Sequence, residues 1–136
     1  MRLEWKERGS DAIFGPGAFS DGTLRFICLA TLFLQPPANM PATIVLDEPE
    51  LGLHPYAIKL LSEMIRSVSH QVQSILSTQS VTLINQFAAP EILVVDRTEG
   101  GSVIRRWDEA EIEHWLEDYS IGDLWEKNVL GGRPGQ

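Results

Sequence analysis

Two adjacent carboxylates at the end of an apolar run are the strongest chemical signal in this sequence. Thr43-Ile44-Val45-Leu46 leads directly into Asp47-Glu48, and Pro49 stops the run. The pattern indicates a buried strand whose C-terminal tip carries both acids. At such a tip one carboxylate can hold a magnesium ion beside a phosphate, and the other can orient or deprotonate the attacking water. On its own the signal is weak, because many strands end in acidic turns.

A second candidate for phosphate chemistry precedes this strand. Ser20, Asp21, Gly22 and Thr23 stand before the apolar run Leu24–Leu34, which predicts a buried helix capped by Ser20 or Asp21 and ended by Pro36-Pro37. The start of a helix exposes backbone N–H groups and the positive end of its dipole, so Ser20 and Gly22 can offer donors to a phosphate. Taken alone, Ser20 is an ordinary helix cap.

A third polar group follows the next strand of the predicted sheet. Gln73–Ser77 indicates a short strand, with Thr78-Gln79-Ser80 as its tip. Because parallel strands share their C-terminal edge, we expect Gln79 at the same edge as Asp47 and Glu48. There its amide can donate to a phosphate oxygen or hold a water, although Gln79 alone is an ordinary loop residue.

One component of a nucleotide site is missing from the sequence. Gly17 and Gly22 have the spacing of a phosphate-binding loop, but Thr23 stands where that motif requires lysine, and no strand directly precedes the loop. No other GxxxxGK[ST] occurs in the sequence. His54, His70 and His114 lack the spacing of zinc ligands.

The remaining elements define an α/β fold with a short, mostly parallel sheet, crossover helices and an antiparallel edge strand. A helix beginning at Pro55 has an apolar face at helical spacing. The other expected elements are strands Met1–Trp5 and Ala12–Phe14, a helix Val81–Phe87, strands Glu91–Val95 and Ser102–Trp107, an acidic helix from Asp108 or Glu109 to about Asp118, and a frayed tail Gly131–Gln136.

Composition limits the classes of protein. The 136 residues correspond to one domain or part of one, and 43% apolar residues can form a modest core. A net charge of −8 argues against a surface that binds nucleic acid or anionic lipid by itself. Cys28 is expected to be a packed thiol. The sequence shows neither a membrane-spanning run nor an apolar signal core, so we expect a cytoplasmic protein.

Four motifs in order resemble those of ABC-type ATPases. Phe19–Thr23 resembles their LSGGQ signature, Thr43–Glu50 their Walker B strand, Leu51–His54 their D-loop, and Ser77–Ser80 their switch region. The resemblance covers roughly residues 19–96. The segment DEPELGLHP, with SDGTLRF before it and STQS after it, is most similar to the motifs of one branch of these ATPases. That branch contains RecF and SMC relatives and OLD-like AAA ATPases from anti-phage systems.

The resemblance implies specific roles and cofactors. ATP and Mg²⁺ would be bound, with Asp47 in the magnesium shell and Glu48 as the catalytic base. Gln79 would stand at the switch position, where many relatives carry histidine, and a glutamine cannot act as an ionisable switch. The residues implied to contact nucleotide or line the dimer interface are Ser20, Asp21, Gly22, Thr23 and His54, with Asp21 in place of a signature glycine.

The resemblance also implies a partial P-loop NTPase fold. Residues 1–136 would be a single partial domain, the C-terminal lobe of an ATPase head, divided into 1–18, 19–96 and 97–136. It would contribute Walker B and signature residues to a dimeric ATP sandwich, and would hydrolyse ATP only when completed by a P-loop half. The implied partners are that missing N-terminal half or a second head, as a homodimer in the full form.

The sequence is also compatible with other functions. A non-catalytic remnant lobe that acts as an interaction module is the main alternative. A metal-dependent nuclease has little support, because no Asp-x-Asp pair follows the core strands. Nucleic acid is conceivable as a partner of a full-length protein in DNA repair or phage defence, but this sequence does not indicate it, and no membrane partner is expected.

Overall fold

The computed structural model describes residues 3–107 and 109–132, with only the backbone of Glu109. The chain forms two compact units, Met1–Leu76 and Ser77–Gln136, which are described separately. Within the described ranges, no helix combines the length and apolar character that crossing a membrane requires. The mixed α/β class predicted from the sequence is confirmed, with short parallel and antiparallel sheets.

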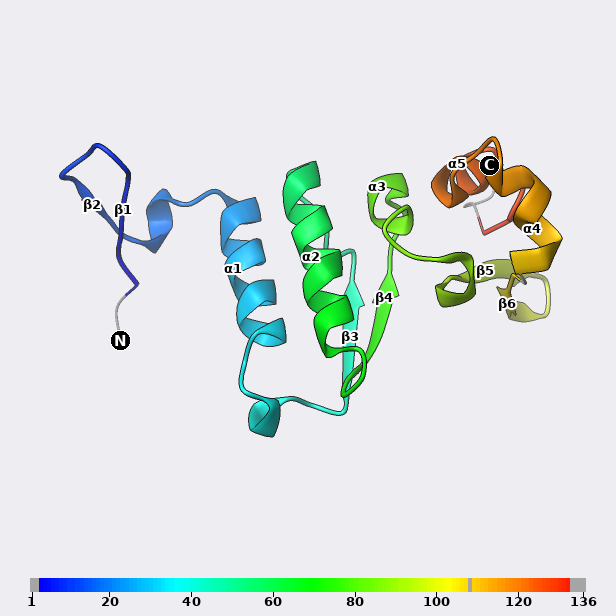
Figure 1. Ribbon diagram of the computed structural model, residues 1–136, viewed down its shortest axis with the longest axis horizontal. Helices are drawn as coiled ribbons and strands as arrows, with labels where there is room; N and C mark the ends of the chain where they lie inside the picture. Colours follow the sequence, from blue (N-terminus) through cyan, green and yellow to red (C-terminus); the bar gives the residue numbers. More distant parts are fainter. Residues whose placement is uncertain (1–2, 108, 133–136) are drawn as a thin grey trace. The chain divides into compact units, whose positions relative to one another are not determined.

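The first unit contains a β–α–β arrangement. Strands β3 (Thr43–Asp47) and β4 (Gln73–Ser77) pair in a two-stranded sheet and run in the same direction (Figure 1), joined by α2 (Pro55–Val68). The backbone N–H of Gln73 donates to the Ala42 carbonyl at 3.0 Å where the strands begin. The first unit also contains β1 (Trp5–Lys6), β2 (Ile13–Phe14), α1 (Asp21–Phe33) and the 3-10 turns η1 (Pro16–Ala18) and η2 (Pro37–Asn39).

Helix α2 follows from its sequence pattern. Pro55 occupies its first turn, where the missing N–H costs nothing. Ile58, Leu61 and Ile65 are buried, which confirms the predicted apolar face. The opposite face carries exposed polar residues such as Lys59 and Glu63.

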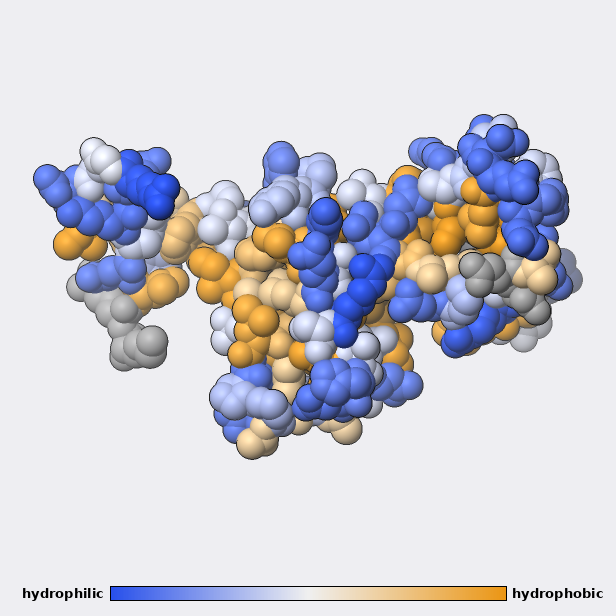
Figure 2. Space-filling model, viewed as in Figure 1, coloured by the Kyte–Doolittle hydropathy of each residue, from blue (hydrophilic) through white to orange (hydrophobic). Residues whose placement is uncertain are grey.

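Helix α1 is apolar along most of its length but is buried on only one side. It packs beside α2, and Leu29 and Phe33 are its buried residues. Figure 2 shows apolar surface over α1. The predicted packed thiol is wrong, since Cys28 is exposed on a part of α1 that no described element covers.

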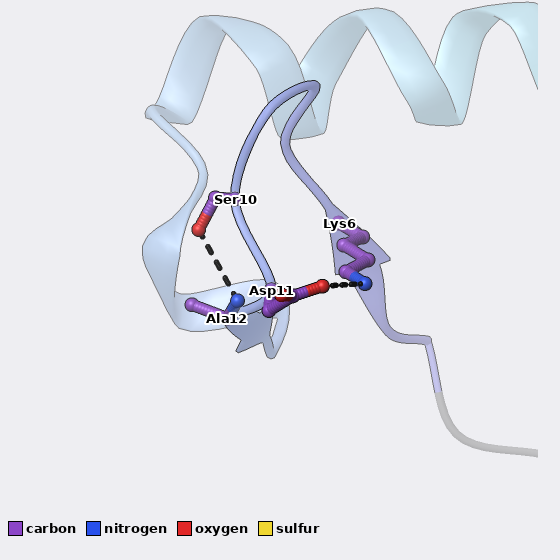
Figure 3. Close-up of polar contacts among 4 residues, drawn as sticks. All are labelled: Lys6, Ser10, Asp11 and Ala12. Carbon is purple, nitrogen blue, oxygen red and sulfur yellow. Dashed lines mark hydrogen bonds and ion pairs between the residues drawn. The ribbon is translucent and has the colours of Figure 1, made fainter.

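The N-terminal hairpin is held by aromatic stacking. Two short strands were expected here, and β1 and β2 pair antiparallel with Trp5 opposite Phe14, although β1 begins at Trp5 rather than near Met1. The Trp5 ring stacks on Phe14 and on Phe19, each with ring centroids 4.9 Å apart. At the end of β1, Lys6 Nζ lies 2.7 Å from Asp11 Oδ1 in an exposed ion pair (Figure 3).

The second unit has its own core and its own sheet. Strands β5 (Leu93–Thr98) and β6 (Gly101–Arg106) form a tight antiparallel hairpin, as expected. The first of them begins later than predicted, because Ala89–Glu91 forms a 3-10 turn (η3) around Pro90. One core cluster of this unit consists of Ala89, Val94, Ile112, Leu124 and Leu130, and Leu83 and Ile84 are also buried.

The helices of the second unit differ from expectation in two places. Helix α3 (Val81–Ile84) is shorter than the predicted Val81–Phe87. Helix α4 (Glu109–Leu116) is the expected acidic helix, while Asp108 lies outside the described residues. Helix α5 (Ile121–Glu126) was not predicted. It begins with a capping box, in which Ser120 Oγ accepts from the Asp123 N–H and the Asp123 carboxylate accepts from the Ser120 N–H.

The segment after α5 is ordered by Asp96. The Gly132 N–H donates to Asp96 Oδ1 at 2.6 Å, and Arg105 donates to the other carboxylate oxygen. The hydrogen bond from Gly132, and after it the bond from Arg105, hold the pKa of Asp96 below its ordinary value. The prediction of a frayed tail from Gly131 is therefore wrong for Gly131 and Gly132. The remaining residues of that tail lie outside the described ranges.

Candidate functional site

The two candidate carboxylates lie where β3 ends. Asp47 is the last residue of the strand and is exposed, while Glu48 is half-buried in the following turn. Glu48 has φ = 43°, a left-handed conformation that costs a non-glycine residue about 1–2 kcal/mol. The Leu51 N–H donates to the Glu48 carbonyl at 3.2 Å and closes the turn. The left-handed residue changes the direction of the backbone, so the side chains of Asp47 and Glu48 need not alternate as they would along a strand.

The start of α1 is built by Ser20. Its Oγ accepts the Thr23 N–H at 3.2 Å and lies 2.9 Å from Thr23 Oγ1, so Ser20 is the predicted cap. Asp21 occupies the first turn, where a carboxylate interacts favourably with the helix dipole. The predicted phosphate contacts Ser20, Asp21, Gly22 and Thr23 thus share one helix start.

The start of α1 packs directly on the turn that follows the carboxylates. A Cβ atom added to Gly22 would lie 2.1 Å from the Gly52 carbonyl oxygen, so glycine is required for this approach. Gly52 itself has φ = 76°, which also favours glycine. The structure therefore joins the 20–23 and 47–52 segments within one unit.

Arg25 adds a second connection that the sequence analysis missed. Its Nη1 donates to the Glu48 carbonyl at 3.1 Å, across 23 residues of sequence. A signal was present, because Arg25 is the only charged residue between Gly22 and Leu34. An isolated cation on an apolar helix suggests a specific acceptor.

His54 caps a helix, and Gln79 is an exposed residue of the second unit. His54 Nδ1 accepts the Tyr56 N–H at 3.2 Å and caps α2, a role not foreseen, while the ring stays exposed. Gln79 is exposed in the second unit, just before Ser80, whose Oγ caps α3. The expected association of Gln79 with Asp47 and Glu48 stays a prediction.

The donor set suits magnesium rather than a metal enclosed by protein ligands. Among the described residues, no three His, Cys, Asp or Glu side chains group closely enough to hold an ion. Magnesium commonly keeps waters and phosphate oxygens and takes one or two carboxylates. Exposed Asp47 at a strand end fits that requirement.

The fold of the chain is similar to that of SMC ATPase heads in solved structures. One solved structure, described as "Structural biochemistry of ATP-driven dimerization and DNA stimulated activation of SMC ATPases", matches with a TM-score of 0.64 and 20% identity, over 86% of this chain and 71% of that one. Another, "Crystal structure of the SmcHead bound to the C-winged helix domain of ScpA", matches with a TM-score of 0.61 and 21% identity, over 75% of this chain and 31% of that one.

The family follows from a match to a family model. The chain belongs to the family described as "AAA domain, putative AbiEii toxin, Type IV TA system", whose model matches residues 2–85. That range includes the 20–23 and 47–54 segments and Gln79. No curated protein matches the sequence significantly.

Proposed function

We propose that this chain is the ATP-hydrolysing lobe of a dimeric ATPase head. Asp47 would hold Mg²⁺ and Glu48 would act as the general base toward water. Ser20, Asp21, Gly22 and Thr23 would contact the γ-phosphate of a nucleotide held mainly by another subunit, with His54 at the interface. Bound Mg²⁺ would neutralise charge on the phosphates.

The observation that carries the proposal is the contact between the start of α1 and the turn after Glu48. Gly22 and Gly52 approach so closely that no side chain fits between their backbones. This contact supports the proposal because it holds the two segments that would contact phosphate and magnesium against each other. Membership of an AAA family and the similarity to SMC heads support the same reading.

The sequence lacks a GxxxxGK[ST] loop, so the β- and γ-phosphates need a cradle from elsewhere. We therefore propose that a lobe bearing such a loop, or a second head, completes the site, and that ATP drives dimerisation as stated for the SMC ATPases in the first matched structure. Gln79 would orient water or phosphate at this site rather than act as an ionisable switch.

The test is the substitution Glu48→Gln in a head that combines this chain with a phosphate-binding loop. Removing the general base is expected to lower kcat by about 100-fold or more, while ATP still binds. Glu63→Gln is the matched control, because Glu63 is an exposed carboxylate on α2. Phosphate release measures the rates, and equal rates for wild type and Glu48→Gln would refute the assignment of the base.

A non-catalytic interaction lobe is the second candidate. Val45 on β3 is 71% exposed and Ile75 on β4 is 48% exposed, so the outward side of this sheet presents apolar surface. Such surface is typical of a face that binds another protein. This function predicts no nucleotide binding or hydrolysis after a phosphate-binding lobe is supplied.

A further inference from the structure

The backbone of Glu48 needs an external restraint. Among the described residues, the non-glycine residues with positive φ are Glu48 and Asn128, and asparagine tolerates this conformation better than glutamate. A left-handed glutamate persists only where its surroundings hold it. The direction of its side chain depends on that conformation, because φ and ψ set the Cα–Cβ vector.

Two donors converge on the Glu48 carbonyl oxygen. One is the Leu51 N–H at 3.2 Å, within the turn itself. The other is Arg25 Nη1 at 3.1 Å, from a separate helix. A carbonyl oxygen has two lone pairs and can accept both bonds. The bond from the guanidinium is charge-assisted and therefore the stronger type.

We propose that Arg25 is a positioning residue that aims Glu48 at its water by fixing the carbonyl of Glu48. This inference rests on the proposed role of Glu48 as base. Arg25 lies on α1 two residues after Thr23, so the helix that would contact one nucleotide also fixes the base. The Gly22–Gly52 contact packs the start of α1 against the turn that follows Glu48.

The first test separates turnover from binding. Arg25→Ala in the completed head is expected to lower kcat about tenfold, as for the loss of one charge-assisted hydrogen bond, with KM for ATP changed less than about twofold. Arg25→Lys keeps a cationic donor and should recover part of the loss. Arg8→Ala, which removes an exposed arginine from the N-terminal hairpin, is the control and should match wild type. Unchanged kcat, or a change confined to KM, would overturn the proposal.

A second readout needs no activity. In the isotopically labelled 136-residue chain, the ¹³Cα and ¹³C′ shifts of Glu48 report its left-handed backbone. Arg25→Ala should move these shifts toward extended values, and Arg8→Ala should leave them unchanged. Unmoved shifts in Arg25→Ala would overturn the positioning role even if Glu48→Gln abolishes turnover. If the shifts move but Glu48→Gln hydrolyses at the wild-type rate, the proposed role of Glu48 as base fails. The catalytic role of Arg25 fails with it, although Arg25 still fixes the backbone of this turn.

Discussion

Substituting Gly22 tests the contact on which the site is built. In Gly22→Ala the new Cβ would lie 2.1 Å from the Gly52 carbonyl oxygen and 3.0 Å from its carbon. Both are backbone atoms, so no rotamer change relieves the overlap, and the two segments must separate by about 1 Å to reach ordinary contact. Alanine gains helix propensity, but overpacking typically costs about 1–3 kcal/mol.

We therefore expect Gly22→Ala to lower the free energy of unfolding by about 1–2 kcal/mol and Tm by about 5 °C. Thermal and urea unfolding followed by circular dichroism measure both quantities. Gly17→Ala is the matched control, because a Cβ at Gly17 meets no atom within 4 Å. Equal stability of Gly22→Ala and Gly17→Ala would refute the close packing of α1 on the turn.

Two further predictions concern the second unit. Gly122→Ala should cost about 1–2 kcal/mol, since its Cβ would lie 2.7 Å from both Asn85 Oδ1 and Val81 Cγ1; urea unfolding measures this cost, and unchanged stability would contradict the packing. The hydrogen bonds of Asp96 with Gly132 and Arg105 lower its pKa in the folded state. Ionised Asp96 therefore stabilises the fold above the unfolded pKa of about 3.9, and this stabilisation is lost as pH falls through that value toward the lower folded pKa. Urea unfolding from pH 5 to pH 3 should therefore show a steeper loss for wild type than for Asp96→Asn, and parallel slopes would contradict it.

Periodicity and turn chemistry predicted much of the fold. The spacing of Ile58, Leu61 and Ile65 identified α2, and the β4 boundaries Gln73–Ser77 were correct. Short elements were less predictable, because α5 spans only Ile121–Glu126 and depends on a local cap rather than on an apolar stripe. The burial of α1 was overestimated, since apolar composition does not reveal which faces a neighbour covers.

The sequence predicted which residues belong to the candidate site but not how they are arranged in space. Asp47, Glu48 and the Ser20 cap follow from motif order and helix-start chemistry. The Gly22–Gly52 approach links residues far apart in sequence, and no local pattern encodes it. The left-handed backbone of Glu48 and its bond to Arg25 likewise depend on packing.

The central claim is that Glu48 is the base of an ATPase head. The most direct measurement is the identity of the nucleotide retained after one turnover by the completed head, followed by rapid quench and chromatography of the bound nucleotide. We expect wild type and Glu63→Gln to contain ADP, and Glu48→Gln to retain unhydrolysed ATP. Retention of ADP by Glu48→Gln at the wild-type rate would contradict the claim.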